Sequence, residues 1–280
     1  MVEARVEPTI TVVADVALGP REEEAVLARV KAAFAFALRA CGWSAPEMIA
    51  AAPIELHIAA LPRGTAARTT GPREFSVASD ALRRADADGV LAHELTHLQD
   101  FRAARGGLRS IPRYLAEGRA LSIGREFRRS LGVCGIDDKR VDAIARLTGE
   151  QAAEALDGFR DGSGLRLARR SGAVFRWMSV SVFFVEFLRT RAHGTGWPDA
   201  LTRLSRVWER VGRGEGFADG FTGEFSQSLE SLEQEFVRFV ASTEGDRTAR
   251  LGRTAYDATV GQTACAAAPA PTTPSRKPTR

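Results

Sequence analysis

Residues 91–97 read Leu-Ala-His-Glu-Leu-Thr-His, and residues 110–120 read Ser-Ile-Pro-Arg-Tyr-Leu-Ala-Glu-Gly-Arg-Ala. The first stretch contains the pattern HExxH. Residues four apart lie on one face of a helix, so His93 and His97 can point at the same metal ion. Glu94 is offset by one residue and reaches a water on that ion rather than the ion itself. This stretch therefore predicts a zinc site carried by a helix.

The flanks of the motif indicate which side of this helix packs. Leu91, Leu95 and Leu98 recur at helical spacing on a different side from the two histidines. One side is therefore expected to be buried and the other to face a cleft. Asp100 follows His97 closely, and it could be solvated or could support that histidine. We favour the solvated position, because the partner of a ligand histidine usually comes from another element.

A zinc site needs a third protein ligand, and Glu117 is the candidate. It follows His97 by 20 residues (117 − 97). Ser110 and Pro112 are typical of a helix start. They place Glu117 in the second turn of a helix that can run back against the first, through the loop at residues 106–107. The two stretches together thus supply three ligands.

HELTH (93–97) followed by YLAEGRA (114–120) resembles the gluzincin metallopeptidases, the thermolysin-like superfamily. Their pattern is HExxH and then an aromatic-led LxEGxA segment about twenty residues on. The resemblance covers about 30 residues of the chain. Position by position, it implies a Zn²⁺ ion held by His93, His97 and Glu117, with Glu94 as the catalytic glutamate.

A weaker likeness, to the C-terminal helices of bacterial gluzincin-like (peptidase-MA-like) domains, extends to residues 179–188 and 216–240. The superfamily also holds an extended substrate along an edge strand before the HExxH helix, and residues 74–78 are the candidate strand. It often stabilises the oxyanion of hydrolysis with a side chain downstream of the third ligand. In this chain Arg176 and Tyr114 are the candidates for an oxyanion or substrate contact.

Outside the motif, β-rich or alternating residues predict strands at 8–17, 54–61 and 74–78, and helical periodicity predicts a helix at 21–40. From about residue 84 onward the periodicity is helical throughout. Gly and Pro residues separate the expected helices, which are 84–104, 111–130, 138–158, 174–192, 198–211 and 227–242.

We therefore expect an α+β fold. A small mixed lobe with a short sheet, about 1–105, precedes a mostly helical lobe, about 106–244, and the zinc site lies on the HExxH helix at their junction. The two lobes form a single domain, 1–244. Residues 245–280 change in composition and end in a stretch of Ala, Pro and Thr, so we expect disorder there.

Composition narrows the functional classes. The net charge is +4 and the pI 9.3, but the arginines are spread along the chain among acids, which favours a solvated surface over a nucleic-acid patch. Three cysteines are too few and too scattered for a disulfide framework. Neither a signal peptide nor an apolar run long enough for a membrane span is recognised. We expect a cytoplasmic protein.

The leading hypothesis is a zinc endopeptidase that acts on a peptide or protein substrate. The alternative is a zinc-binding domain without catalysis that serves as a scaffold or binds a partner. A third hypothesis, a basic nucleic-acid-binding protein, ranks last. The sequence carries no signal for an oligomeric state.

Overall fold

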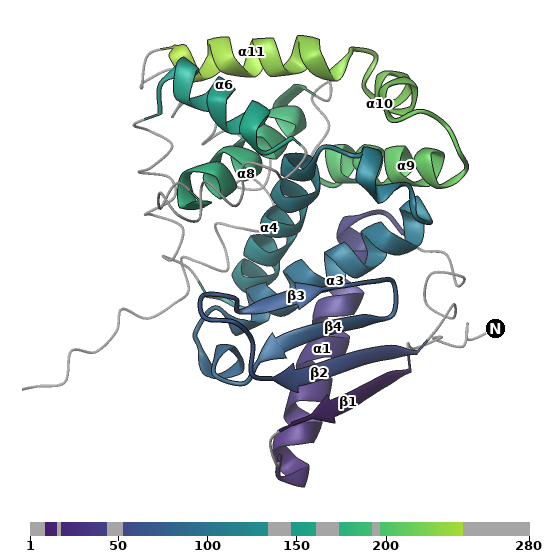
Figure 1. Cartoon of the computed structure of the whole chain (residues 1–280), viewed down its shortest axis with the longest axis vertical. Helices are drawn as coiled ribbons and strands as arrows, with labels where there is room; N and C mark the ends of the chain where they lie inside the picture. Colours follow the sequence, from purple (N-terminus) through teal and green to yellow (C-terminus); the bar gives the residue numbers. More distant parts are fainter. Residues whose placement is uncertain are drawn as a thin grey trace, which may run out of the picture.

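The computed structural model describes residues 9–15, 18–43, 53–133, 147–160, 174–191 and 197–242. Its fold is mixed: a four-stranded sheet near the N-terminus is followed by a predominantly helical remainder (Figure 1). This confirms the α+β class expected from the sequence. The proposed tail at 245–280, and the first part of the helix expected at 138–158, lie outside the described residues.

The sheet has the strand order β1-β2-β4-β3. Strands β1 (Ile10–Ala14), β2 (Ile54–Ala59) and β4 (Glu74–Ala78) run parallel, whereas β3 (Ala67–Thr69) pairs antiparallel with β4. The expectation that 74–78 is an edge strand is therefore wrong. The short strand β3 folds back onto β4 and covers the edge that β4 would otherwise expose.

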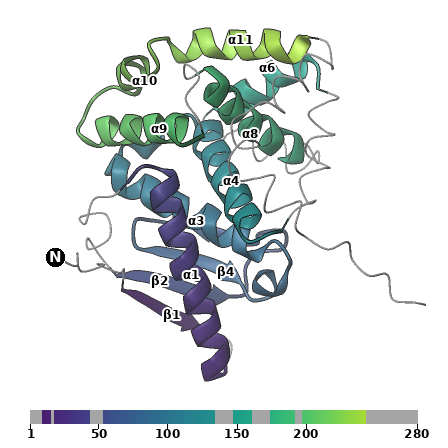
Figure 2. The same ribbon diagram turned by 180° about the vertical axis from the view of Figure 1, so that it is seen from behind.

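Helix α1 (Pro20–Ala40) lies behind the sheet in Figure 1 and in front of it in Figure 2. The alternation of β2 explains this arrangement, because Ile54, Leu56 and Ile58 are buried while Glu55 and His57 between them are more exposed. Apolar side chains of one strand face therefore pack on the helix layer. His57 is a partly buried strand residue, as the sequence indicated.

The helical part begins with α3 (Ala87–Ala104), which carries the HExxH motif, and α4 (Arg113–Ser130), which carries Glu117. Two one-turn 3₁₀ helices precede them, η1 (Ala81–Arg83) and η2 (Gly107–Ser110). The remaining helices are α6 (Gly149–Gly158), α8 (Val174–Arg191), α9 (Trp197–Gly212), α10 (Phe217–Phe225) and α11 (Leu229–Ala241). Of these, only α10 was not expected as a separate helix.

Helix α3 contacts the sheet edge at β3 and also packs on α1, α4 and α9. It ends at Ala104, and the next two residues, Arg105 and Gly106, both lie in the left-handed region (φ 46° and 96°), as the glycine pair at 106–107 predicted. Helix α4 then returns against α3 and forms the centre of the helical layer in both views (Figures 1 and 2). The two motif helices are thus direct neighbours.

Small residues on α4 allow this close packing. A Cβ on Gly124 would lie 2.5 Å from the carbonyl oxygen of Gly89 on α3, and a Cβ on Gly118 would lie 2.2 Å from that of Ser181 on α8. No side chain fits at either crossing. None of the helices in the described part of the chain is both long and apolar enough to cross a membrane.

Candidate metal centre

The packing of α3 orients the HExxH motif. Leu91, Leu95 and Leu98 are fully buried in the core, whereas the side chains of His93 and His97 keep 14% and 15% of their surface exposed. The apolar side of the helix thus packs inward and the histidines face an opening, as the leucine spacing predicted. Glu117 lies in the second turn of α4, which begins after Pro112.

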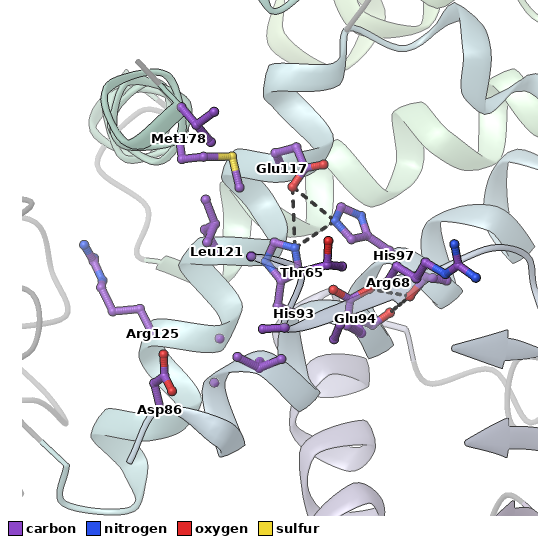
Figure 3. Close-up of a pocket in the computed structure, with 18 of the residues that line it drawn as sticks. Thr65, Arg68, Asp86, His93, Glu94, His97, Glu117, Leu121, Arg125 and Met178 are labelled. Carbon is purple, nitrogen blue, oxygen red and sulfur yellow. Dashed lines mark hydrogen bonds and ion pairs between the residues drawn. The ribbon is translucent and has the colours of Figure 1, made fainter. Parts of the chain in front are cut away.

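The structure brings the three predicted ligand residues together (Figure 3). The Nε2 atoms of His93 and His97 lie 3.0 Å apart. Each of them is 3.5 Å from Oε2 of Glu117. The other carboxylate oxygen, Oε1, accepts a hydrogen bond of 3.3 Å from Arg113, which leaves Oε2 turned toward the imidazoles.

These distances can be compared with what a zinc ion requires. A tetrahedral ion with bonds of about 2.0–2.2 Å holds its ligand atoms about 3.3–3.6 Å apart. The three separations between the candidate ligand atoms, 3.0, 3.5 and 3.5 Å, lie close to this range. Two imidazole nitrogens and one carboxylate oxygen are also ligands that zinc accepts in catalytic sites. The donor set therefore fits zinc in both chemistry and size.

The electrostatics of the cluster favour a positive charge between these groups. Burial disfavours a charged imidazole, but Glu117, with Asp100 and Glu94 nearby, outweighs it and raises the pKa of His97 above its ordinary value. Burial likewise disfavours the Glu117 carboxylate, yet His97 and His93 hold its pKa well below the ordinary value. A divalent cation at the same place would meet the same field.

Asp100 does not lie in solvent, contrary to the expectation from the sequence. It is fully buried, with Oδ2 3.5 Å from Nδ1 of His97 and Oδ1 paired with the guanidinium of Arg119 on α4. Arg119 is itself fully buried between the rings of Trp43 and Trp208, at 4.7 and 5.3 Å from their centroids. The carboxylate therefore stands behind a candidate ligand histidine and is itself paired with a buried cation.

The side chain of Glu94 accepts a hydrogen bond from a residue of the sheet. The hydroxyl of Thr69, on β3, lies 2.8 Å from its Oε2 and 2.9 Å from its main-chain oxygen. Glu94 is buried to 6% exposure at the wall of the opening. Thr69 was not identified from the sequence, because a single threonine in a three-residue strand carries no periodic signal.

The opening is a cavity of about 900 Å³. The segment 62–69, helices α3 and α4, and the start of α8 form its walls, and Figure 3 shows Met178 of α8 beside Glu117. Five arginines line it: Arg63, Arg68, Arg113, Arg125 and Arg128. The cavity is therefore basic except at Asp86, Glu94 and Glu117.

The two weaker site candidates are placed elsewhere. Tyr114 is fully buried, its hydroxyl is hydrogen-bonded to Glu233 on α11, and its ring packs edge-on against Phe184. Arg176 is exposed on the first turn of α8. Neither is among the residues that line the cavity. We therefore assign Tyr114 to packing between α4, α8 and α11, and we assign no contact to Arg176.

Compared with protein-family models, with curated proteins and with solved structures, the chain matches none of them. What it does must therefore be argued from the chemistry of this cluster and the cavity around it.

Proposed function

We propose that the protein is a zinc-dependent peptidase of the gluzincin type, with its metal centre where the sheet-bearing lobe meets the helical lobe. One observation carries the proposal: three ligand-type atoms from α3 and α4 face one another at 3.0–3.5 Å beside an additional buried glutamate. Bound zinc would supply a Lewis acid for the scissile carbonyl and lower the pKa of water.

The role of Glu94 follows from its position. A hydrogen bond from Thr69 to Oε2 restrains its carboxylate and leaves Oε1 to accept a proton. Glu94 takes that proton from the attacking water and passes it to the leaving nitrogen. The new C–O bond forms first and places negative charge on the carbonyl oxygen; the C–N bond then breaks, so one water is consumed and a carboxylate and an amine result.

Strand β3, at the end of the sheet, indicates where a peptide substrate would lie. Residues of β3 line the cavity, and among the described strands β3 is hydrogen-bonded to β4 alone. An extended peptide can therefore lie along β3 and exchange main-chain hydrogen bonds with it, which brings one peptide group past Glu94. Arg113 lies beside Glu117 at the same wall, where its guanidinium can meet developing negative charge.

The test is the variant Glu94→Gln. It should retain zinc but lower turnover of a cleaved peptide by about two orders of magnitude or more, the scale of losing a general base. Glu74→Gln, a matched change on β4 outside the cavity, should leave turnover unchanged. Metal content and peptide cleavage are measured on the same preparations.

Full activity in Glu94→Gln would contradict the mechanism. Zinc binding by the wild type without cleavage across a broad peptide library would instead favour the alternative, a zinc-binding domain that serves as a scaffold or binds a partner.

A further inference from the structure

The cavity continues from the metal ligands along one face of α4. Glu117, Leu121, Gly124, Arg125 and Arg128 all line it, and they are spaced by three or four residues, so they share one side of the helix. In Figure 3, Leu121 lies between Glu117 and Arg125, and Arg125 lies at the end away from Arg68. With a helical rise of 1.5 Å per residue, Arg128 is about 16 Å along α4 from Glu117.

Arg128 is buried without the partners that other buried arginines have. It is only 8% exposed, and its Nε and Nη2 atoms are shielded from solvent but make no hydrogen bond within the described part of the chain. By contrast, Arg119 is paired with Asp100, and Arg189 with Glu186. A buried guanidinium without an acceptor carries a substantial desolvation cost. An anion that enters the cavity would remove that cost.

The neighbouring helix leaves space for this side chain. A Cβ on Gly89 of α3 would lie 2.5 Å from Cδ of Arg128, so the stem of Arg128 crosses α3 where α3 has no side chain. Gly89 also lines the cavity. The arginine is thus seated between the two motif helices at the cavity wall.

The charged residues that line the cavity near Arg128 already have partners of opposite charge, whereas no residue that the structure describes offers one to the guanidinium of Arg128. Asp86 lines the same end, but Arg84 holds both of its carboxylate oxygens at 3.0 and 2.7 Å. Arg125 is hydrogen-bonded to Glu126 and Glu186, at 3.2 and 3.0 Å. The charge of Arg125 is therefore already balanced, whereas Nε and Nη2 of Arg128, the donors of the two-pronged contact that guanidinium makes with carboxylate, have no acceptor among the described residues.

We propose that Arg128 binds a carboxylate of the peptide substrate, so that the enzyme selects peptides with an acidic side chain or a free C-terminus several residues from the cleaved bond. This inference rests on the proposed peptidase function. An extended chain advances about 3.3–3.6 Å per residue, so 16 Å corresponds to about four or five residues. The carboxylate is therefore expected at that separation from the bond that is cleaved.

The test measures binding to the zinc-loaded Glu94→Gln protein, so that hydrolysis does not interfere. The probes are fluorescein-labelled, C-terminally amidated dodecapeptides of Ala, Ser and Leu, in which a single Glu is moved through every position. Each Glu peptide is compared with the peptide that has Gln at the same position. A third set of peptides carries Gln and a free C-terminal carboxylate. Fluorescence anisotropy gives the dissociation constants.

We expect the best Glu peptide to bind about tenfold more tightly than its Gln counterpart, on the scale of a hydrogen bond to a charged group. Arg128→Gln should abolish this preference. Arg128→Lys, which keeps the charge but not the paired donors, should reduce it to a few-fold. Arg213→Gln removes the same charge from an exposed turn outside the cavity and should retain it in full. The free-terminus arm identifies which carboxylate is preferred.

Equal binding of the Glu and Gln peptides to the protein with Arg128 intact, including no binding of either, would overturn the subsite. An undiminished preference in both Arg128 variants would overturn it as well. Failure of the peptidase proposal alone gives a different result. The tenfold preference for the Glu peptide is then present and depends on Arg128, but the wild-type protein cleaves neither peptide.

Discussion

Asp100 and Arg119 place two opposite charges in the core directly behind His97. Oδ2 of Asp100 lies 3.5 Å from Nδ1 of His97. A carboxylate beside this ring nitrogen favours the tautomer protonated there, which would leave Nε2 available to a metal. The aromatic rings of Trp43 and Trp208 enclose the Arg119 cation, and Ser205 accepts a further hydrogen bond of 2.8 Å from it. The pair therefore restrains the surroundings of one candidate ligand, His97.

Asp100→Asn should weaken zinc binding by about 10–100-fold, the range reported for partners of ligand histidines. It should also destabilise the fold, because Arg119 loses its buried counter-charge. Zinc affinity is measured by competition with a chelator of known affinity. Ser205→Ala is the control, since it perturbs Arg119 without touching His97 and should leave zinc affinity nearly unchanged. An unaltered affinity in Asp100→Asn would exclude this role.

At the residue scale, the sequence predicted that His93, His97 and Glu117 come together, and the structure places their ligand-type atoms 3.0–3.5 Å apart. The histidines follow from a helical spacing of four residues, and Glu117 from its place on a second helix that returns against the first. Asp100 could not be assigned in the same way. Its burial depends on Arg119, which is contributed by another helix, and on rings more than fifty residues away in either direction along the chain. Thr69 is a comparable case, because only the pairing of β3 with β4 brings it to Glu94.

At the element scale, α4 lies at the centre of the helical layer because two of its residues lack a side chain where its neighbours cross. Gly118 immediately follows the candidate ligand Glu117, and its Cα faces the main chain of Ser181 on α8. The glycine thus sets how closely α8, which contributes Met178 to the cavity, approaches the candidate metal ligands.

Gly118→Ala should destabilise the protein by about 1–3 kcal/mol, since a Cβ at 2.2 Å from a carbonyl oxygen forces α4 and α8 apart. The better helix propensity of alanine offsets only part of this cost. Chemical denaturation measures the change. Gly71→Ala, at a position with open space around it, should change the free energy of unfolding by less than about 0.5 kcal/mol. Equal stability of the two variants would contradict the packing argument.

The elements that the sequence predicted well are those with a long apolar repeat, such as α3 and α4. The two that it missed are short. Strand β3 has three residues, of which two are polar, and its position is determined by pairing rather than by pattern. Without β3, the sequence predicts 74–78 as the edge strand, whereas the structure places β3 outside it. Helix α10 has nine residues between two turns, with Phe217, Phe221 and Phe225 four apart.

At the scale of the whole molecule, the candidate site joins parts that fold from different regions of the chain. The histidines come from α3, Glu117 from α4, and Thr69 from the sheet edge. A metal bound by ligands from both helices would stabilise the folded state by linkage, because the unfolded chain does not hold the ligands together. Zinc is therefore expected to raise the midpoint of thermal unfolding.

The most direct test of the account is the zinc content of the purified protein, measured by elemental analysis together with thermal unfolding. The described residues hold two groups of three potential ligands, His93, His97 and Glu117 on the helices and Glu55, His57 and Glu74 on the sheet. We predict that the first group holds about one zinc per chain in the wild type. His93→Ala and Glu117→Ala should lose it, together with the zinc-dependent rise in midpoint, whereas His57→Ala, a histidine on the sheet outside the cavity, should retain both. Absence of zinc from the wild type after reconstitution, or equal loss in His57→Ala, would contradict the account.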